Sequence, residues 1–365
     1  GPLRLVVTGA PAPVVAVRWR VALLALGALG LVVGVLAGLA RFGVTVPDAA
    51  AGKAALHGPL MIGGFFGVVI SLERAVALGR RVAYAAPLLA GLSTLTTFAG
   101  WPHAPWLLVA ASLVLLAATA DVVRRQPALF TFTLLCGVAS WLVGNVGWAL
   151  SGAAHASTWW WLAFLVLTIA GERLELSRLM PPSPAAQRVF AAILAAFAVA
   201  LAASGTPSGV RLLGAALLAL AAWLVRQDVA RRTVRTTGLT RYVAVCLLSG
   251  YAWLAVAGVL LLVGDATPGG AQRDAALHAL ALGFVFAMVF GHAPIIVPAV
   301  LRARLPYHPF FYVPLVLLHA SLAARVAADL VAVPPFARAP AVANALVLAL
   351  FVLTMATSVL RARTA

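Results

Sequence analysis

The stretch LHALALGFVFAMVFGHAPIIVPAV, Leu277–Val300, decides the class of fold. It contains no Asp, Glu, Lys or Arg, and a helix of about 20 apolar residues is long enough to cross about 30 Å of hydrocarbon. The stretch is therefore predicted to be a transmembrane helix. It also carries two imidazoles, His278 and His292, which are unusual inside a bilayer and mark a functional site.

The rest of the chain has the same character. Of its 365 residues, 64% are hydrophobic and 10% are charged, whereas soluble domains average about 25% charged residues. The composition predicts an all-α, polytopic integral membrane protein that forms a single domain over residues 1–365. Twelve apolar spans are expected, at residues 20–40, 57–77, 82–100, 104–122, 129–150, 157–177, 187–205, 209–226, 242–264, 275–300, 309–332 and 340–360.

The formal charge of +17 is explained by membrane insertion. The basic residues punctuate the apolar spans instead of gathering in one soluble segment, so no nucleic-acid partner is expected. With the N-terminus in the cytoplasm, twenty of the 26 basic residues fall in inner segments, as the positive-inside rule requires. Twelve spans then place both termini in the cytoplasm, with lipid as the surrounding partner and no cleavable signal peptide.

Two parts of the chain resemble each other, residues 56–90 and residues 277–315. Each begins Leu-His, has a Gly-Phe step soon afterwards, reaches a pair of arginines, and continues to a tyrosine and a proline. A weak internal repeat in parallel orientation is one interpretation. Chance similarity between apolar helices is the other.

The predicted topology sorts the histidines by depth. His57 and His278 lie near the outer ends of their spans, and His292 and His319 lie in the inner half of theirs. Fourteen residues of helix separate His278 from His292 by about 21 Å, so one metal cannot bind both. The sequence predicts an outer centre at His57 and His278 and an inner centre at His292 and His319. His103, His155 and His308 are expected to be interfacial polar residues.

Haem suits such histidine pairs, because the macrocycle brings four nitrogens of its own and buries apolar surface. Without a C-x-x-C-H motif, one or two non-covalently bound b-type haems are expected. Met61 follows His57 by one helical turn, and this pair offers nitrogen and sulfur to copper instead. Cys136 and Cys246 lie in apolar spans, so no cysteine cluster is expected. The alternative is that the histidines only hydrogen-bond between helices.

Charged residues at the ends of two spans are candidate cofactor contacts. Glu172 and Arg173 are interpreted either as a proton entry or clamp for haem propionates, or as a charged cap that sets topology. Arg325 can pair with Asp329 one helical turn away and is a further candidate for a propionate. Asn145 is expected to hydrogen-bond between helices.

The motifs HGPLM at His57–Met61 and HALALGFVFAM at His278–Met288 resemble those of the NnrS family of bacterial haem- and copper-containing membrane proteins. The first match is partial, since the second histidine and the glutamate of that family's motif are missing. Span 57–77 is also similar to the haem-bearing span of haem-copper oxidase catalytic subunits, but no His-His copper motif occurs. The resemblance implies haem, with copper as an option, a bacterial cytoplasmic membrane, and a role linked to nitric oxide, nitrosative stress or respiration.

The sequence thus favours a haem-binding membrane protein that transfers electrons or binds a diatomic gas, with a quinone or a cytochrome as electron donor. The alternative is a proton-coupled transporter of small molecules with histidines in its cavity. A protein for cofactor insertion or assembly is a third option. No catalytic residue is assigned, because Walker, Rossmann and hydrolase motifs are all absent.

Overall fold

The computed structural model describes residues 14–177, 181–265, 267–331 and 334–364. Over these residues every regular element is a helix, so the all-α prediction is confirmed there. Helices satisfy all their backbone hydrogen bonds internally, which is what an apolar surrounding demands. In chain order the elements are α1 (Val17–Ala40), α2 (Asp48–Ala51), η1 (Ala54–Leu56), α3 (His57–Pro59), η2 (Leu60–Phe66), α4 (Gly67–Leu78), η3 (Arg81–Tyr84), α5 (Ala85–Phe98), α6 (Ala104–Arg125), α7 (Leu129–Ser151), η4 (Ala154–Ser157), α8 (Thr158–Leu176), α9 (Pro184–Ala202), α10 (Pro207–Gln227), α11 (Ala230–Thr233), α12 (Gly238–Val263), α13 (Ala271–His278), η6 (Ala279–Phe286), α14 (Ala287–Leu301), η7 (Pro309–Phe311), α15 (Tyr312–Val331) and α16 (Pro334–Thr364).

Each of the twelve expected spans contains a helix, but in the described part of the chain only eleven helical segments are long and apolar enough to cross a membrane. The exception is α5, whose 14 residues extend about 21 Å at 1.5 Å per residue. The prediction of twelve full spans is therefore met for eleven of them.

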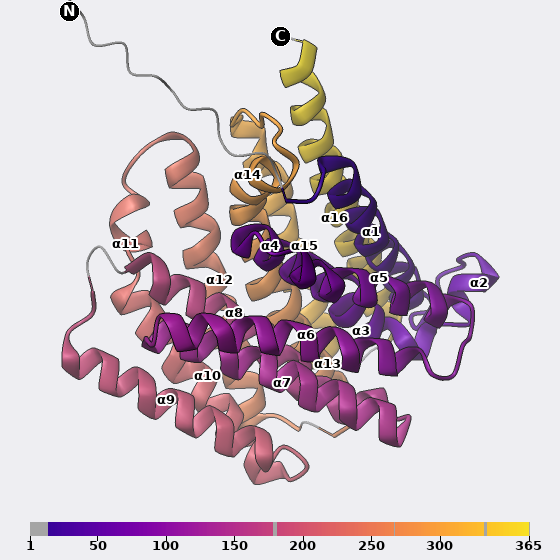
Figure 1. Ribbon diagram of the computed structural model, residues 1–365. Coiled ribbons are helices and arrows are strands. Elements are labelled where there is room, and N and C mark those ends of the chain that lie inside the picture. Colours follow the sequence, from indigo (N-terminus) through magenta and orange to yellow (C-terminus); the bar gives the residue numbers. More distant parts are fainter. Residues whose placement is uncertain (1–13, 178–180, 266, 332–333, 365) are drawn as a thin grey trace, which may run out of the picture.

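Helix α1 begins and helix α16 ends on the same side of the helical bundle (Figure 1). Arg20, near the start of α1, donates to the carbonyl of Val300 at the end of α14. Ser358, near the end of α16, donates to the carbonyl of Pro306, which follows α14.

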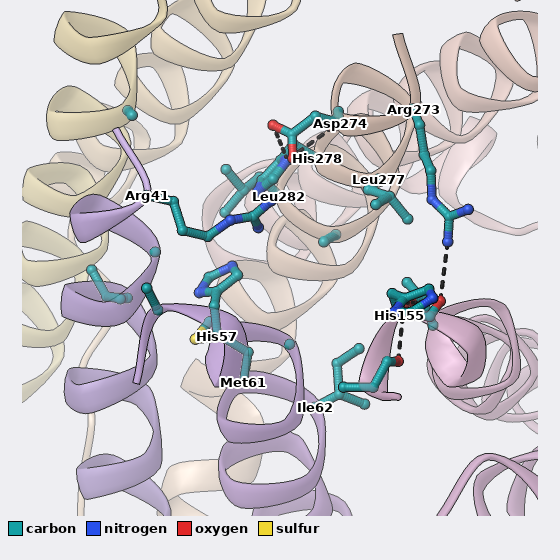
Figure 2. A pocket seen from close by; sticks show the side chains of 18 of the residues that line it. Arg41, His57, Met61, Ile62, His155, Arg273, Asp274, Leu277, His278 and Leu282 are labelled. Atoms are coloured by element: carbon teal, nitrogen blue, oxygen red, sulfur yellow. Dashed lines mark hydrogen bonds and ion pairs between the residues drawn. The ribbon is translucent and has the colours of Figure 1, made fainter. Parts of the chain in front are cut away.

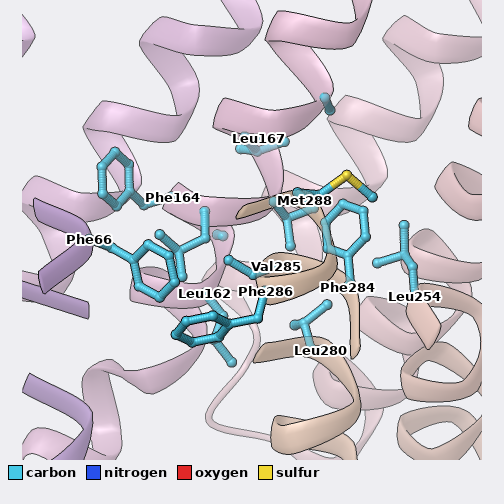
Figure 3. Packing of buried hydrophobic residues seen from close by; sticks show 14 of the residues in the cluster. Phe66, Leu162, Phe164, Leu167, Leu254, Leu280, Phe284, Val285, Phe286 and Met288 are labelled. Atoms are coloured by element: carbon cyan, nitrogen blue, oxygen red, sulfur yellow. The ribbon is translucent and has the colours of Figure 1, made fainter. Parts of the chain in front are cut away.

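The centre of the bundle is formed by α8, buried around its whole circumference, against the segment η6 (Figure 3). Phe164 stacks on Trp141 of α7 with ring centroids 4.9 Å apart. Glycines allow close backbone approach elsewhere: a Cβ on Gly214 of α10 would lie 2.7 Å from the carbonyl oxygen of Gly258 on α12. Small residues at such crossings are typical of helices that pack in membranes.

Two segments of the bundle are π-helical, and each directly follows a predicted histidine ligand. The π-helix η2 begins three residues after His57, and the π-helix η6 begins at the residue after His278. π-Helices are rare and are found most often at functional sites. The two segments that begin Leu-His, and that resemble each other in sequence, are thus both followed by a π-helix.

Aromatic rings at equivalent positions of the two Leu-His segments lie near one another. The rings of His57 and His278 are 6.3 Å apart at an interplanar angle of 19°. Phe65 and Phe286 each lie eight residues further along, and their rings are 6.1 Å apart at 7°.

Candidate functional site

A cavity of about 860 Å³ opens at the end of the bundle where α1 ends and α13 begins. It is bordered by the end of α1, the segment η1–α3–η2, η4 with α8, α13 with η6, and parts of α15 and α16. Its floor is apolar and includes Ile62, Phe66, Leu282 and Phe286. A cavity of this size, apolar with a few convergent polar groups, is the usual form of a small-molecule or cofactor site.

His57 and His278 both line this cavity. The Nδ1–H of His57 donates to the carbonyl of Gly34 on α1 at 2.7 Å. The Nδ1–H of His278 donates to the carbonyl of Asp274 at 2.9 Å and lies 3.2 Å from the Asp274 carboxylate. Because donation from Nδ1 fixes the tautomer, each neutral ring keeps a lone pair on Nε2 for a ligand. No hydrogen bond to either Nε2 occurs among the described residues.

Helix α1 is shaped to receive the His57 ring. A Cβ at Gly38 would lie 2.7 Å from His57 Nδ1, and a Cβ at Gly34 would lie 2.8 Å from the sulfur of Met61. These two glycines, one turn apart, let both side chains pack against the α1 backbone. Met61 lines the cavity below His57 (Figure 2), with its sulfur directed at α1.

The charged groups of the cavity form two sets: an ion-pair cluster around Arg325, and two further arginines that line other parts of the cavity. Asp274 accepts from Arg325 Nη2 at 2.8 Å, and Arg325 Nε lies 3.8 Å from Asp329. Arg325 thus has two carboxylates beside it, and the predicted pair with Asp329 is the longer of its two ion pairs. Arg41 and Arg273 line other parts of the cavity.

Figure 2 shows Arg41 reaching towards His57 and His278, with Arg273 on the opposite side near His155. Arg273 donates to the backbone carbonyl of His155 at 3.2 Å, and its guanidinium lies 5.0 Å from the ring centre of Trp159. The guanidinium groups therefore approach the cavity from two sides.

His292 and His319, the pair predicted for an inner centre, each hydrogen-bond to other groups. Trp253 Nε1 donates to His319 Nδ1 at 3.0 Å, and His319 Nε2 bonds to Ser249 Oγ at 2.9 Å. With Nδ1 accepting, Nε2 must carry the proton, so His319 has no lone pair left for a metal. His292 donates from Nδ1 to the carbonyl of Met288 at 2.7 Å. The sequence predicts that His292 and His319 lie at the same depth along their helices. The His319 side chain, however, points to Trp253 and Ser249.

Glu172 and Arg173, interpreted from the sequence as a proton entry or propionate clamp or as a charged cap, are not among the residues that line this cavity. Glu172 is 3.6 Å from Arg74. Arg173 makes a bidentate pair with Asp228, at 2.7 and 2.9 Å. Burial acts to raise the pKa of Asp228, but the bonds and charge of Arg173 hold that pKa below its ordinary value. These residues stabilise the packing of α8 against the α10–α11 connection.

Asn145 behaves as the sequence predicts. Its Nδ2 donates to the carbonyl of Leu108 at 3.2 Å, and its Oδ1 accepts from Trp161 Nε1 at 2.9 Å. The residue joins α6, α7 and α8 and is fully buried.

Sequence reasoning missed Asp274, Arg41 and Asn344 as cavity residues. Asp274 precedes His278 by four residues, a spacing that places both on one helix face and could have identified it. Arg41 and Asn344 gave no such signal, since each belongs to a helix far from His278 in the chain.

Comparison with known proteins places the chain in a family without assigning an activity. A family model described as "Domain of unknown function (DUF8744)" matches residues 20–360, so the chain belongs to that family. No curated protein and no solved structure matches the chain.

Proposed function

We propose that this member of the DUF8744 family binds one haem between His57 and His278, for electron transfer or for binding a diatomic gas such as nitric oxide. The observation that carries the proposal is the pair of imidazoles, each with Nδ1 held by a carbonyl and Nε2 available. The two rings lie close together, with centres 6.3 Å apart and planes at 19°, and would be the residues that hold the haem iron.

The donor set favours haem over a bare ion. Within the described residues no group of three His, Cys, Asp or Glu side chains is arranged to hold a metal ion. Two imidazoles suffice when the metal brings its remaining nitrogens in a macrocycle. Met61 adds a sulfur beside His57, but that sulfur packs on Gly34, so copper is the weaker option.

The cavity also suits a large, flat, apolar group with acidic substituents. Phe66 and Phe286 supply apolar surface, and Arg41 and Arg273 supply guanidinium groups suited to carboxylates. These two arginines replace Arg325 as propionate partners, because Arg325 already faces two carboxylates. When bound, haem supplies an iron that exchanges single electrons and binds diatomic gases.

The two histidines differ in how they are supported. The carboxylate of Asp274 lies beside the Nδ1 of His278, and such a partner orients a ligand and raises its basicity. His57 has only the neutral carbonyl of Gly34. His278 would therefore be the more basic of the two ligands to a bound haem.

The haem test is spectroscopic. Purified protein titrated with haemin is expected to develop a Soret band at one haem per chain. His57→Ala and His278→Ala are expected to reduce that stoichiometry, while the matched control His292→Ala keeps it. Retention of full haem binding by both variants would exclude this site and favour the alternative, a transporter with cavity histidines.

The orientation of the protein follows from its arginines and its ends. α1 begins and α16 ends on one side of the bundle, and the positive-inside rule assigns that side to the cytoplasm. The histidine pair then lies towards the outer face of a bacterial cytoplasmic membrane. A fluorescent protein fused to the C-terminus is expected to mature in the cytoplasm, and a dark fusion with an active periplasmic reporter would reverse the assignment.

A further inference from the structure

The same cavity contains a second group of polar atoms, at the side formed by α15 and α16. Asn344 of α16 and Arg325 and Asp329 of α15 all line it. Their exposed fractions are 3%, 5% and 5%. Both polar atoms of the Asn344 side chain, Arg325 Nε and Asp329 Oδ2 have no hydrogen-bond partner.

These unpaired atoms are fixed in place by the groups around them. Arg325 is anchored by its Nη2 bond to Asp274, and its guanidinium lies 4.8 Å from the ring centre of Phe42. Arg325 Nε and Asp329 Oδ2 are 3.8 Å apart, too far for a hydrogen bond. A donor and an acceptor are therefore held side by side, and neither makes a hydrogen bond.

A satisfied buried amide in this protein looks different. Asn145 uses Nδ2 and Oδ1 to bond two neighbouring helices, whereas Asn344 uses neither atom. Buried polar groups are normally paired, because leaving one unpaired loses its hydration without compensation. Asn344 is thus not explained by helix packing, and a ligand in the cavity would complete its bonds.

The unpaired atoms define the chemistry of that ligand. Arg325 Nε and Asn344 Nδ2 donate, while Asp329 Oδ2 and Asn344 Oδ1 accept. The positive charge of Arg325 is compensated by the carboxylates of Asp274 and Asp329, so an uncharged head group fits better than an anion. The ligand needs oxygen atoms that accept hydrogen bonds in one chemical state of the ligand and donate them in another.

The walls beside these atoms are lined by small and apolar residues. Gly38, Phe42, Ala341, Ala345 and Leu348 border the cavity here. Small side chains on α16 leave room for a ring between helices, and apolar walls favour a ligand that dissolves in the membrane.

We propose that Arg325, Asp329 and Asn344 form a subsite for the head group of a membrane quinone. The oxidised ring accepts hydrogen bonds from Arg325 Nε and Asn344 Nδ2. The hydroxyl groups of the reduced ring donate hydrogen bonds to Asp329 Oδ2 and Asn344 Oδ1. This subsite goes beyond the haem proposal and does not depend on it, although a quinone bound there would share a cavity with His57 and His278.

The test is a binding measurement on purified full-length protein in detergent, without added haem. Decylubiquinone and its reduced form, decylubiquinol, are titrated by calorimetry. Asn344→Leu keeps the side-chain volume and removes both polar atoms. Asp329→Asn keeps the shape and removes the carboxylate. Ser321→Ala on α15 is the control, since its hydroxyl is exposed and bonds only within its own helix.

Asn344→Leu is expected to weaken both forms about tenfold or more, the loss that one or two hydrogen bonds bring. Asp329→Asn is expected to weaken decylubiquinol more than decylubiquinone, and Ser321→Ala to change neither. Thermal unfolding of each variant shows whether it remains folded, and Asn344→Leu is expected to unfold no earlier than the parent.

Three results would overturn the proposal: no measurable quinone binding to the parent, equal affinity of parent and Asn344→Leu, or displacement of the quinone by detergent-solubilised phospholipid alone. The first would mean that the atoms bind only water. Because haem is absent from the assay, a failed haem titration leaves this outcome unaffected, and a failed quinone titration leaves the haem proposal standing.

Discussion

Replacing Asp228 with asparagine tests the buried ion pair that holds α8 to the α10–α11 connection. Asp228 accepts two bonds from Arg173, one from Tyr251 and one from the backbone amide of Ala230. The side chains of Arg173 and Asp228 are 6% and 3% exposed. The substitution keeps the shape of the side chain and leaves the guanidinium without its counter-charge.

The expected cost follows from that burial. Breaking a buried pair by removing one partner destabilises a protein by about 3–5 kcal/mol. Because asparagine retains one acceptor for Arg173 or Tyr251, the lower end of that range, about 3 kcal/mol, is expected for Asp228→Asn.

Asp121 provides the matched control. It also contacts several arginines, Arg80, Arg124 and Arg125, but these are 53%, 78% and 66% exposed. Exposed ion pairs contribute little to stability because water and salt screen them, so Asp121→Asn is expected to change the free energy of unfolding much less than Asp228→Asn does.

Unfolding by dodecyl sulfate in mixed micelles, followed by circular dichroism, measures both variants. An equal effect of Asp228→Asn and Asp121→Asn would refute the reasoning that burial decides the strength of these pairs. So would a loss below about 1 kcal/mol for Asp228→Asn, the value typical of an exposed pair.

Three further predictions follow from single contacts. The pKa of Asp228 is below its ordinary value in the folded protein. The ionised carboxylate therefore contributes fully to the free energy of unfolding above the unfolded pKa of about 3.9, and this contribution is lost as pH falls through the folded pKa. Acid unfolding of Asp228→Asn should lack this pH-dependent loss of stability. Gly38→Ala would place a Cβ 2.7 Å from His57 Nδ1, so haem stoichiometry in the haemin titration should fall. Asn145→Leu leaves Trp161 Nε1 without its acceptor and should lower the free energy of unfolding by about 1–3 kcal/mol, whereas unchanged stability would show that the amide is dispensable.

The fold was largely predictable because the bilayer imposes a simple rule. A run of about 20 apolar residues must be helical, and every expected span does contain a helix. The shortened helix α5 was not foreseen, since its apolar run continues past Phe98 into a turn closed by Gly100 at φ +78°. The π-helices after His57 and His278 were not foreseen either, because the extra residue in each turn has no signature in the apolar pattern.

Matching the depths of histidines along their helices correctly placed His57 and His278 in one cavity. The same reasoning did not predict the partners of His319. Periodicity gives the level of a side chain, but its direction depends on how each helix is rotated within the bundle. The first pair faces one cavity. His319 faces Trp253 and Ser249 instead.

The sequence by itself determined that this protein is a bundle of apolar helices, that its basic residues lie between the apolar segments, and that a few imidazoles lie within those segments. Those are properties of single segments in contact with an apolar solvent, so they are encoded locally. Only the tertiary structure decided which polar groups meet: Arg325 with Asp274, His57 with His278, and Asn344 in the same cavity. Those partners come from helices far apart in the chain, and their association depends on close packing that no local pattern specifies.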